Sequence, residues 1–426
     1  MNNDINKLVP ELRFPEFVNQ GEWQQKTLNE ITSSIFDGTH QTPKYTENGI
    51  PFFSVENLIS GNKNKFISEE DHIIATNKNK PEKFDLLITR IGNIGFPKII
   101  DWDYEFSIYV TLAVIKKSKQ FNSYYLYSFI QSDFYQKEIK SKSLLNATPC
   151  KINMDELRKT KILLPPDREQ KEQKKIADCF SSLNELLSAY SKKLESLKSH
   201  KKGLMQNLFP QEDKKVPKLR FKKFEKDGEW EEKLIEDFFD VGSSKRVLQE
   251  NWTSEGVPFY RTRELVSLSK NAPFGSEIFI SEKLFSELSK NYGIPTEGDF
   301  LISGVGTLGI SYQVKKNDRF YFKDGNVLWF KIKKKLCSSY FKFCFQSNHI
   351  QGQIIAQTSL STVGTYTIQN AKKTKFWYPS SLNEQQEIAD TLSSLDDLIK
   401  EQSNKIEQLN FHKKGLMQRL FPNISN

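Results

Sequence analysis

The sequence predicts a mixed α/β (α+β) fold. Two globular domains are separated by two long helices, which pair with each other as an intramolecular antiparallel coiled coil. Three observations predict this fold: blocks of sequence that recur in both halves of the chain, a heptad pattern after each globular segment, and short apolar runs within those segments. The recurrence indicates a tandem duplication with pseudo-twofold symmetry.

The recurring blocks keep the same order in the two halves. KKGLMQNLFP at 201–210 returns as KKGLMQRLFP at 413–422. The other matched blocks are PELRFPEF (10–17) and PKLRFKKF (217–224), GEW (21–23 and 228–230), GIPF (49–52) and GVPF (256–259), FDLLITRIGNIG (84–95) and GDFLISGVGTLG (298–309), and EQKKIAD (172–178) and EQQEIAD (384–390). A period of about 210 residues is the size of a duplicated domain and is too long for a solenoid repeat.

Four parts of the chain follow from this pattern. We predict a globular domain at 1–165, a helix at 166–212, a second globular domain at 213–378 and a second helix at 379–426. The helical parts are close copies, whereas the globular parts share only scattered blocks. We therefore expect the helices to perform one task twice and the globular domains to perform two versions of another task.

Short apolar-alternating runs indicate strands in both globular domains. The runs FDLLITRI, YVTLAVIK, GDFLISGV and NVLWFKIK are separated by stretches with Gly, Pro and Asn. Helices are expected at SYYLYSFIQSDFYQKEI (123–139) and SSYFKFCFQSNHIQGQII (338–355). This mixture predicts an α/β (α+β) domain in each half.

Each helical part carries apolar residues at alternating spacings of four and three, which is the seam of a coiled coil. The seam residues are Ile176, Phe180, Leu183, Leu187, Leu194, Leu197, Leu204 and Leu208 in the first helix, and Ile388, Leu392, Leu395, Ile399, Ile406, Leu409, Leu416 and Leu420 in the second. The signals for helix starts and ends are Pro165-Pro166-Asp167 and Pro210 for the first helix, and the Ser381–Glu384 capping box and Pro422 for the second. Lys201 and Lys413 occupy matching seam positions, where a polar residue can fix the register.

The nearest partner for each seam is the other helix of the same chain. Helices related by a pseudo-twofold axis run antiparallel, whereas a parallel homodimeric coil would leave the duplication unexplained. Gly203 and Gly415 lie inside the helical pattern, at a cost of about 1 kcal/mol each relative to Ala. Three readings stay open for them: a tolerated defect, a close crossing of two backbones, or contact with a partner protein.

The net charge of +9 favours a polyanionic partner. Residues 213–378 contain 27 Lys and Arg against 19 Asp and Glu, whereas residues 1–166 contain 21 against 20. Because Arg reads guanine and Lys contacts phosphate, basic residues in loops are candidates for DNA binding, although each could also be a solvated surface charge. The candidates are Lys78, Lys80, Arg90, Lys245, Arg246, Arg261, Arg263, Lys315 and Lys316.

Two of these candidates form a pattern. Arg261 and Arg263 alternate along a predicted strand, so we expect them to share one face, and they stand where the first half has Ser54 and Glu56. The recurring turns GNIG and GTLG allow two interpretations, a close approach of the backbone to phosphate or a structural β-turn.

Catalytic, metal and membrane functions find no support in the sequence. There is no NPPY-like tetrapeptide for base methylation, the five histidines are isolated, and the four cysteines lack zinc-site spacing. No run of 18 apolar residues could span a membrane, and the first residues contain no secretory signal. These features predict a cytoplasmic protein that is not itself an enzyme and holds no cofactor or metal.

The order of the blocks resembles the specificity subunit of type I restriction–modification systems. The resemblance spans essentially the whole chain and is carried by the PxLRFxxF and GEW openings, the GIPF and GVPF blocks, the GDFLISGVGTLG block, EQxxIAD at the helix starts and GLMQxLFP at the helix ends. It implies two target-recognition domains, each of which reads one half of a bipartite site in double-stranded DNA. It also implies that the two helices set the spacer between the half-sites.

The resemblance further implies the partner subunits and their cofactors. Two methyltransferase subunits that use S-adenosylmethionine would dock on the helices, and restriction subunits would use ATP and magnesium. Equivalent docking surfaces would explain why the helix ends are duplicated. The docking residues would be Gly203, Leu204, Met205, Gly415, Leu416 and Met417.

Two other functions remain as alternatives. The chain could be a stand-alone nuclease or methyltransferase with unusual motifs, in which case it would cut or methylate DNA by itself. It could also be an assembly scaffold that binds DNA without sequence preference.

Overall fold

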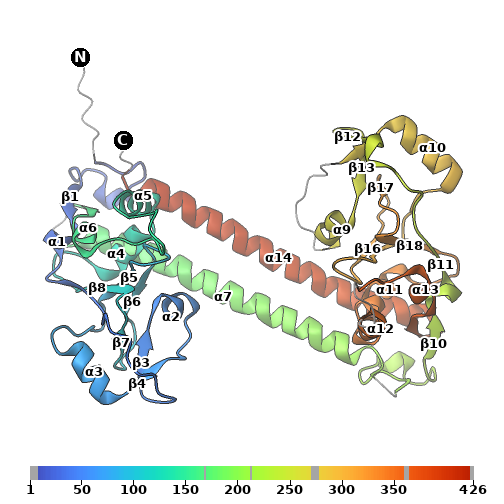
Figure 1. The fold of residues 1–426 in the computed structure, drawn as a ribbon, viewed down its shortest axis with the longest axis horizontal. Helices are drawn as coiled ribbons and strands as arrows, with labels where there is room; N and C mark the ends of the chain where they lie inside the picture. Colours follow the sequence, from blue (N-terminus) through green and yellow to red (C-terminus); the bar gives the residue numbers. More distant parts are fainter. Residues whose placement is uncertain (1–7, 167–168, 212–213, 270–277, 359–363, 423–426) are drawn as a thin grey trace. The chain divides into compact units, whose positions relative to one another are not determined.

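A computed structural model describes residues 8–166, 169–211, 214–269, 278–358 and 364–422. The chain forms two compact units, each of which draws segments from both halves of the sequence (Figure 1). The first unit combines Met1–Lys192 with Asn404–Asn426, and the second unit is Lys193–Ser403. Each long helix is therefore divided between the two units.

The described residues of the first unit form three sheets. Their strands, in spatial order, are β1 (Gln24–Thr27) and β9 (Lys161–Leu164); β2 (Ile35–Asp37), β8 (Leu112–Ile115), β5 (Leu86–Thr89) and β6 (Pro97–Ile99); and β4 (Phe66–Ile67), β3 (Ile50–Phe53) and β7 (Ser107–Ile108). The predicted strands FDLLITRI and YVTLAVIK are β5 and β8. They pair antiparallel at the centre of the four-stranded sheet, where both are completely buried.

Apart from its parts of the two long helices, the first unit contains only short helices among the described residues. They are α1 (Leu28–Ile31), α2 (Val55–Ser60), α3 (Glu69–Thr76), α4 (Ser123–Ile130), α5 (Asp133–Ser141) and α6 (Met154–Arg158), with one 3-10 turn at Pro15–Phe17. The single helix predicted at 123–139 is thus two helices. Ser132 breaks it, because its hydroxyl accepts a hydrogen bond from the Tyr135 amide and caps α5.

The second unit repeats this plan. Its strands, in spatial order, are β10 (Glu231–Leu234) and β19 (Lys375–Tyr378); β11 (Phe239–Gly242), β18 (Val327–Ile332), β15 (Phe300–Ser303) and β16 (Ser311–Gln313); and β12 (Trp252–Thr253), β14 (Phe279–Ile280), β13 (Val257–Tyr260) and β17 (Tyr321–Phe322). Its shorter helices are α8 (Ile235–Phe238), α9 (Thr262–Ser269), α10 (Glu282–Tyr292), α11 (Ser338–Phe345), α12 (Asn348–Thr358) and α13 (Ile368–Lys373), with 3-10 turns at Lys222–Phe224 and Gln249–Asn251. The predicted strands GDFLISGV and NVLWFKIK are β15 and β18, and the helix predicted at 338–355 is α11 and α12.

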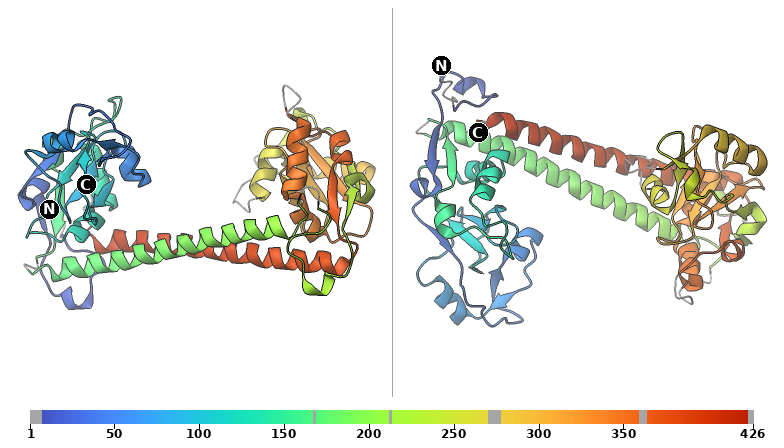
Figure 2. Two further views of the ribbon diagram at one scale, coloured as in Figure 1. Left: turned by 90° about the horizontal axis from the view of Figure 1, so that it is seen from below. Right: turned by 45° about the horizontal axis from the view of Figure 1, so that its top comes forward.

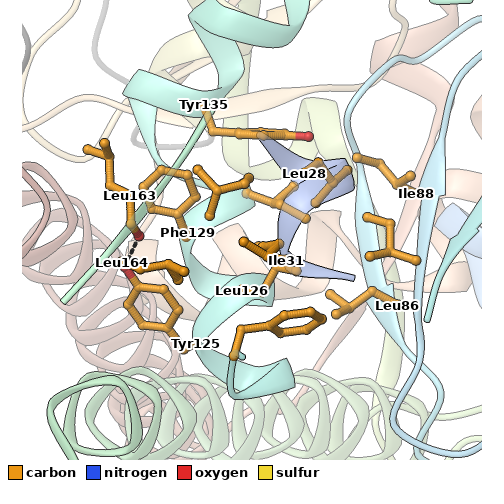
Figure 3. Packing of buried hydrophobic residues seen from close by; sticks show 14 of the residues in the cluster. Leu28, Ile31, Leu86, Ile88, Tyr125, Leu126, Phe129, Tyr135, Leu163 and Leu164 are labelled. Carbon is orange, nitrogen blue, oxygen red and sulfur yellow. Dashed lines mark hydrogen bonds between the residues drawn. The ribbon is translucent and has the colours of Figure 1, made fainter. Parts of the chain in front are cut away.

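Aromatic side chains from α4 fill the core of the first unit (Figure 3). Tyr125 and Phe129 stack at 6.2 Å, and the Tyr125 hydroxyl donates to the Leu163 carbonyl at 2.5 Å. In the second unit, Tyr340 occupies the matching place and donates to the Trp377 carbonyl at 2.7 Å. The duplication therefore preserves a buried tyrosine that ties a helix to a strand.

The two long helices are α7 (Lys171–Asn207) and α14 (Leu382–Leu420), which are drawn from two further directions in Figure 2. In the first unit, the start of α7 packs on the end of α14, with Lys413 Nζ 2.7 Å from Asn184 Oδ1. In the second unit, the end of α7 packs on the start of α14, with Lys201 Nζ 2.6 Å from Asp396 Oδ1. Residue numbers rise along one helix as they fall along the other, so the predicted antiparallel pairing is confirmed in each unit.

The predicted seam agrees with the burial of the side chains. All sixteen apolar seam residues are buried or half-buried. Asn184 and Asp396 are matching positions in the two halves, so each seam lysine meets a polar partner at the same place. Burial lowers the pKa of the Lys413 ammonium, whose hydrogen-bond partner is the neutral Asn184 amide.

One interpretation of the helical glycines is wrong. A Cβ atom built on Gly203 or Gly415 meets no atom within 4 Å apart from the helix's own nearby backbone. No second backbone therefore crosses closely at either position. A tolerated defect and a contact with a partner protein remain.

Candidate nucleic-acid interface

Two buried ion pairs hold the globular domains to the starts of the long helices. Arg13 Nε and Nη2 donate to the Glu172 carboxylate at 2.8 and 2.7 Å, and Arg220 donates in the same way to Glu384 at 2.7 and 2.9 Å. Each arginine side chain is at most 6% exposed and each glutamate side chain is 1% exposed. The LRF and EQ blocks therefore recur because they make the same bidentate joint in each unit.

Sequence reasoning missed these joints, although both blocks were recognised as repeats. The predicted capping box at the start of α14 is only half present. The Ser381 hydroxyl accepts from the Glu384 amide at 3.4 Å, but the Glu384 carboxylate is held by Arg220 and by Trp230 Nε1 at 3.2 Å. At the start of α7, Asp167 lies outside the described residues.

The GLMQxLFP blocks connect each half of the chain to the core of the other half. Leu208 and Phe209 at the end of α7 are buried in the second unit, where Phe209 lies 5.7 Å from Tyr340. Leu420 and Phe421 at the end of α14 are buried in the first unit, where Phe421 stacks on Phe180 at 5.9 Å. The proposed docking residues Leu204, Met205, Leu416 and Met417 are partly buried against these cores. Much of the repeated block therefore has a structural role.

The three basic residues predicted to bind DNA in the first domain differ in how accessible their side chains are to a ligand. Lys78 is exposed after α3, whereas Lys80 is ion-paired with Glu105. Arg90 is buried, and its Nη1 donates to Asp37 at 3.0 Å and to the Val110 carbonyl at 2.9 Å. Burial lowers the pKa of the Arg90 guanidinium, and the Asp37 carboxylate opposes that effect. In this arrangement Arg90 Nη1 is held at the end of β2, while Nε is buried without a hydrogen-bond partner among the described residues.

The prediction that Arg261 and Arg263 share one face of a strand is wrong. Strand β13 ends at Tyr260 and α9 begins at Thr262, because the Glu264 carboxylate accepts the Arg261 amide at 2.9 Å and so caps the helix. Both guanidiniums converge on this buried carboxylate, at 2.7 and 3.1 Å. Burial raises the pKa of Glu264, but hydrogen bonds from Arg261 outweigh it and lower the pKa overall.

The remaining candidates of the second domain are exposed. Lys245 lies over the Tyr292 ring at 5.4 Å, and Arg246 is paired with Asp324 at 3.0 Å while 72% of its side chain remains exposed. Lys315 and Lys316 are exposed in the turn after β16. These side chains come from separate loops of the second domain, and all can reach a polyanion without rearrangement of the core.

The last glycine of each of the GNIG and GTLG turns packs against a helix. Each links two strands, β5 to β6 and β15 to β16, with positive φ at both glycines. A Cβ at Gly95 would come within 3.2 Å of Gln136, and one at Gly309 within 3.0 Å of Gln351. Both turns therefore pack against a helix, which supports the β-turn interpretation.

Within the described residues, no group of three or more His, Cys, Asp or Glu side chains could hold a metal ion. Among the same residues, no helix combines the length and the apolar character that crossing a membrane requires.

The chain belongs to the type I restriction modification DNA specificity domain family, whose model matches residues 20–199 and 227–408. It is 26% identical to a Methanocaldococcus jannaschii protein named as the MjaX type I restriction enzyme specificity subunit, over 94% of this chain and 92% of that protein.

Solved structures show the same fold. The type I restriction-modification S subunit from M. genitalium superposes with a TM-score of 0.60 at 16% identity, covering 98% of this chain and all of that one. A chain from a study of assembly and conformational transition of the type I system superposes with a TM-score of 0.56 at 14% identity, covering 94% and 98%.

Proposed function

We propose that this chain is the DNA specificity subunit of a type I restriction–modification complex, and that each globular domain reads one half of a bipartite site. This proposal rests on one observation: the contacts that attach each globular domain to the long helices are the same in both units, but the exposed residues of the domains differ. The ion pair and the aromatic anchor are the same in both units, whereas exposed positions differ. Glu56 of the first domain, for example, corresponds to Arg263 of the second, and both side chains are largely exposed. Two globular domains with different exposed surfaces are thus attached to the long helices in the same way.

The long helices set the spacer between the two half-sites in this proposal. Helix α7 has 37 residues, which correspond to roughly 55 Å at about 1.5 Å per residue. One turn of DNA is about 34–36 Å. Helix α7 is therefore longer than one turn of DNA, which suits half-sites whose centres lie at least one turn apart. Methylation and cleavage belong to other subunits, which bind S-adenosylmethionine, ATP and magnesium, and the complex acts on DNA in the cytoplasm.

Exchange of residues 213–378 for the corresponding domain of a relative is expected to change one half of the recognised sequence and leave the other half intact. The donor must retain the residues equivalent to Trp230 and Tyr340, because Phe209 packs between them. Methylome sequencing of cells that carry the partner subunits reads both halves directly. Reinsertion of the native domain through the same junctions is the control. A change in both halves would show that the domains do not read independently.

Two methyltransferase subunits dock, in this proposal, on matching faces of α7 and α14. Lys202 and Lys414 are exposed beside Gly203 and Gly415, and both glycines face open space. A helical glycine costs about 1 kcal/mol relative to Ala. Close approach of a partner element would explain why this cost recurs in both copies. Restriction subunits join the assembly through other contacts.

Ala and Leu at these glycines should have opposite effects. Gly203→Ala and Gly415→Ala are expected to raise the free energy of unfolding by about 1 kcal/mol each, because no neighbouring atom opposes the methyl group. Gly203→Leu with Gly415→Leu is expected to abolish co-purification of the methyltransferase subunits. Ser188→Leu, at an exposed position of α7, is the control. Normal assembly of the double Leu variant would leave the glycines as tolerated defects.

A further inference from the structure

A cleft of about 460 Å³ lies in the first domain between two polar walls. The loop 38–44 after β2 forms one wall, and the segment 71–79, which includes the end of α3, forms the other. Phe52 and Ile67 from the β3–β4 pair close its floor. We call this feature the amide cleft, because exposed Gln and Asn side chains occur on both walls.

The loop wall is fixed to the domain. A Cβ on Gly38 would lie 2.0 Å from the Ile108 carbonyl oxygen, so only glycine fits there. The Thr39 amide donates to the same carbonyl at 3.1 Å, and the Thr39 carbonyl accepts from the Val110 amide at 3.0 Å. Further along the loop, the Thr42 hydroxyl lies 3.3 Å from the Tyr109 hydroxyl. The loop is therefore held in one conformation, as a reading surface requires.

The helical wall is fixed as well. His72 of α3 is 3% exposed, and its Nδ1 lies 2.8 Å from the Ser107 hydroxyl on β7. The Ser68 hydroxyl caps the helix by accepting from the Asp71 amide at 3.1 Å. On the outer side, Ile74 faces the cleft while 69% of it is exposed. An apolar group in that position can contact the methyl group of thymine.

The mouth of the cleft carries the chemistry of adenine recognition. Gln41, Asn77 and Asn79 are exposed and line the cleft. Their amide groups can pair bidentately with adenine N6 and N7. Lys44 and Lys78 flank them, where ammonium groups can contact phosphate.

Guanine recognition lacks its usual residue in this domain. Residues 1–165 contain three arginines, and each is engaged by the protein itself. Arg13 is held by Glu172, Arg90 by Asp37, and Arg158 by Asp155 and the Ile35 carbonyl. The second domain, by contrast, exposes Arg246 by 72%.

We propose that the amide cleft is the base-reading site of the first domain, and that it selects adenine at one or more positions of its half-site. The proposal rests on the proposed function, because it assigns the reading of one half-site to particular residues. Gln41, Asn77 and Asn79 contact base edges, and the two lysines position the phosphate backbone.

The test uses the full chain with the subunits that co-purify with it. Duplexes in which the half-site of the first domain is randomised compete for binding, and the bound fraction is sequenced. The parent is expected to enrich adenine at defined positions. Gln41→Ala, Asn77→Ala or Asn79→Ala should reduce that discrimination by about 5- to 150-fold at one position, with the other half-site unaffected. Asn146→Ala, an exposed amide of the same domain outside the cleft, is the matched control.

The outcomes separate this proposal from the proposed function. A parent complex without any sequence preference would overturn both. A parent with a preference that all three variants retain would overturn only the amide cleft. Uniform weakening across all sequences would also overturn it, because that pattern belongs to phosphate contacts. Lys78→Ala is expected to show this uniform pattern, and thermal unfolding of each variant verifies that the domain remains folded.

Discussion

Glu384→Gln is expected to lower the free energy of unfolding of the second unit by roughly 3–5 kcal/mol, because it leaves the Arg220 guanidinium buried without a counter-charge. The hydrogen bond to Glu384 raises the pKa of Arg220 in the parent protein, and the variant loses that contribution. A guanidinium nevertheless keeps its proton in proteins, so Arg220 stays charged. Urea unfolding followed by tryptophan fluorescence measures the loss. Trp230 is a suitable probe, since its indole nitrogen also donates to Glu384.

A neighbouring exposed pair provides the control. Glu387 is ion-paired with Lys223, whose side chain is 59% exposed. Glu387→Gln should therefore cost less than about 1 kcal/mol. Similar losses for the two glutamates would show that burial does not determine the strength of the Arg220–Glu384 joint.

Replacement of both partners tests the physical cause. Arg220→Met combined with Glu384→Leu removes both charges and keeps apolar volume, so it should recover much of the stability lost in the single variant. In the first unit, Glu172→Gln should have a slightly smaller effect than Glu384→Gln. The reason is that Trp23 Nε1 has no hydrogen-bond partner among the described residues, whereas the hydrogen bond from Trp230 Nε1 loses its charged acceptor.

Phe421→Ala is expected to destabilise the first unit by roughly 3–5 kcal/mol, which is typical of a large buried aromatic side chain. Phe421 is 2% exposed, and its ring lies 5.4 Å from Phe129, 5.9 Å from Tyr125 and Phe180, and 6.3 Å from Trp23. A substitution near the end of the sequence should thus loosen the domain built from its beginning. Hydrogen exchange of β5 and β8 would locate the effect.

Phe411→Ala is the matched control on the same helix. Phe411 is 80% exposed, so its loss should change stability by less than about 0.5 kcal/mol. Phe209→Ala should reproduce the effect of Phe421→Ala in the second unit, where Phe209 is 1% exposed. An effect of Phe421→Ala no larger than that of Phe411→Ala would contradict the packing of the chain end into the first domain.

Periodic features were predictable from the sequence, whereas features that depend on distant partners were not. The seam residues and the central strands were placed correctly, because burial on one face imposes a period that is visible in the residues themselves. The split at Ser132 was missed, since a capping serine interrupts a helix without interrupting its apolar pattern. Arg261 and Arg263 were misplaced for a similar reason, because Glu264 starts a helix where alternation favoured a strand.

The candidate site likewise combines features that the sequence shows with features that depend on distant partners. Basic residues could be counted from the sequence, but their availability could not, because it depends on which carboxylate folds beside each one. Arg90 and Arg246 look alike in the sequence, yet one is buried on Asp37 and the other is largely exposed. The amide cleft gave no signal at all, since its two walls are separated along the chain and consist of common loop residues.

The sequence by itself determined the duplication, the heptad seams and the mixed character of the domains, because each is written in local spacing or in the comparison of one half with the other. Only the tertiary structure decided why the repeated blocks recur. The arginine of each LRF block finds its glutamate across 159 or 164 residues, and the phenylalanine of each LFP block enters the core of the opposite half. Contacts of this kind are selected by shape and charge in three dimensions, and no local pattern records them.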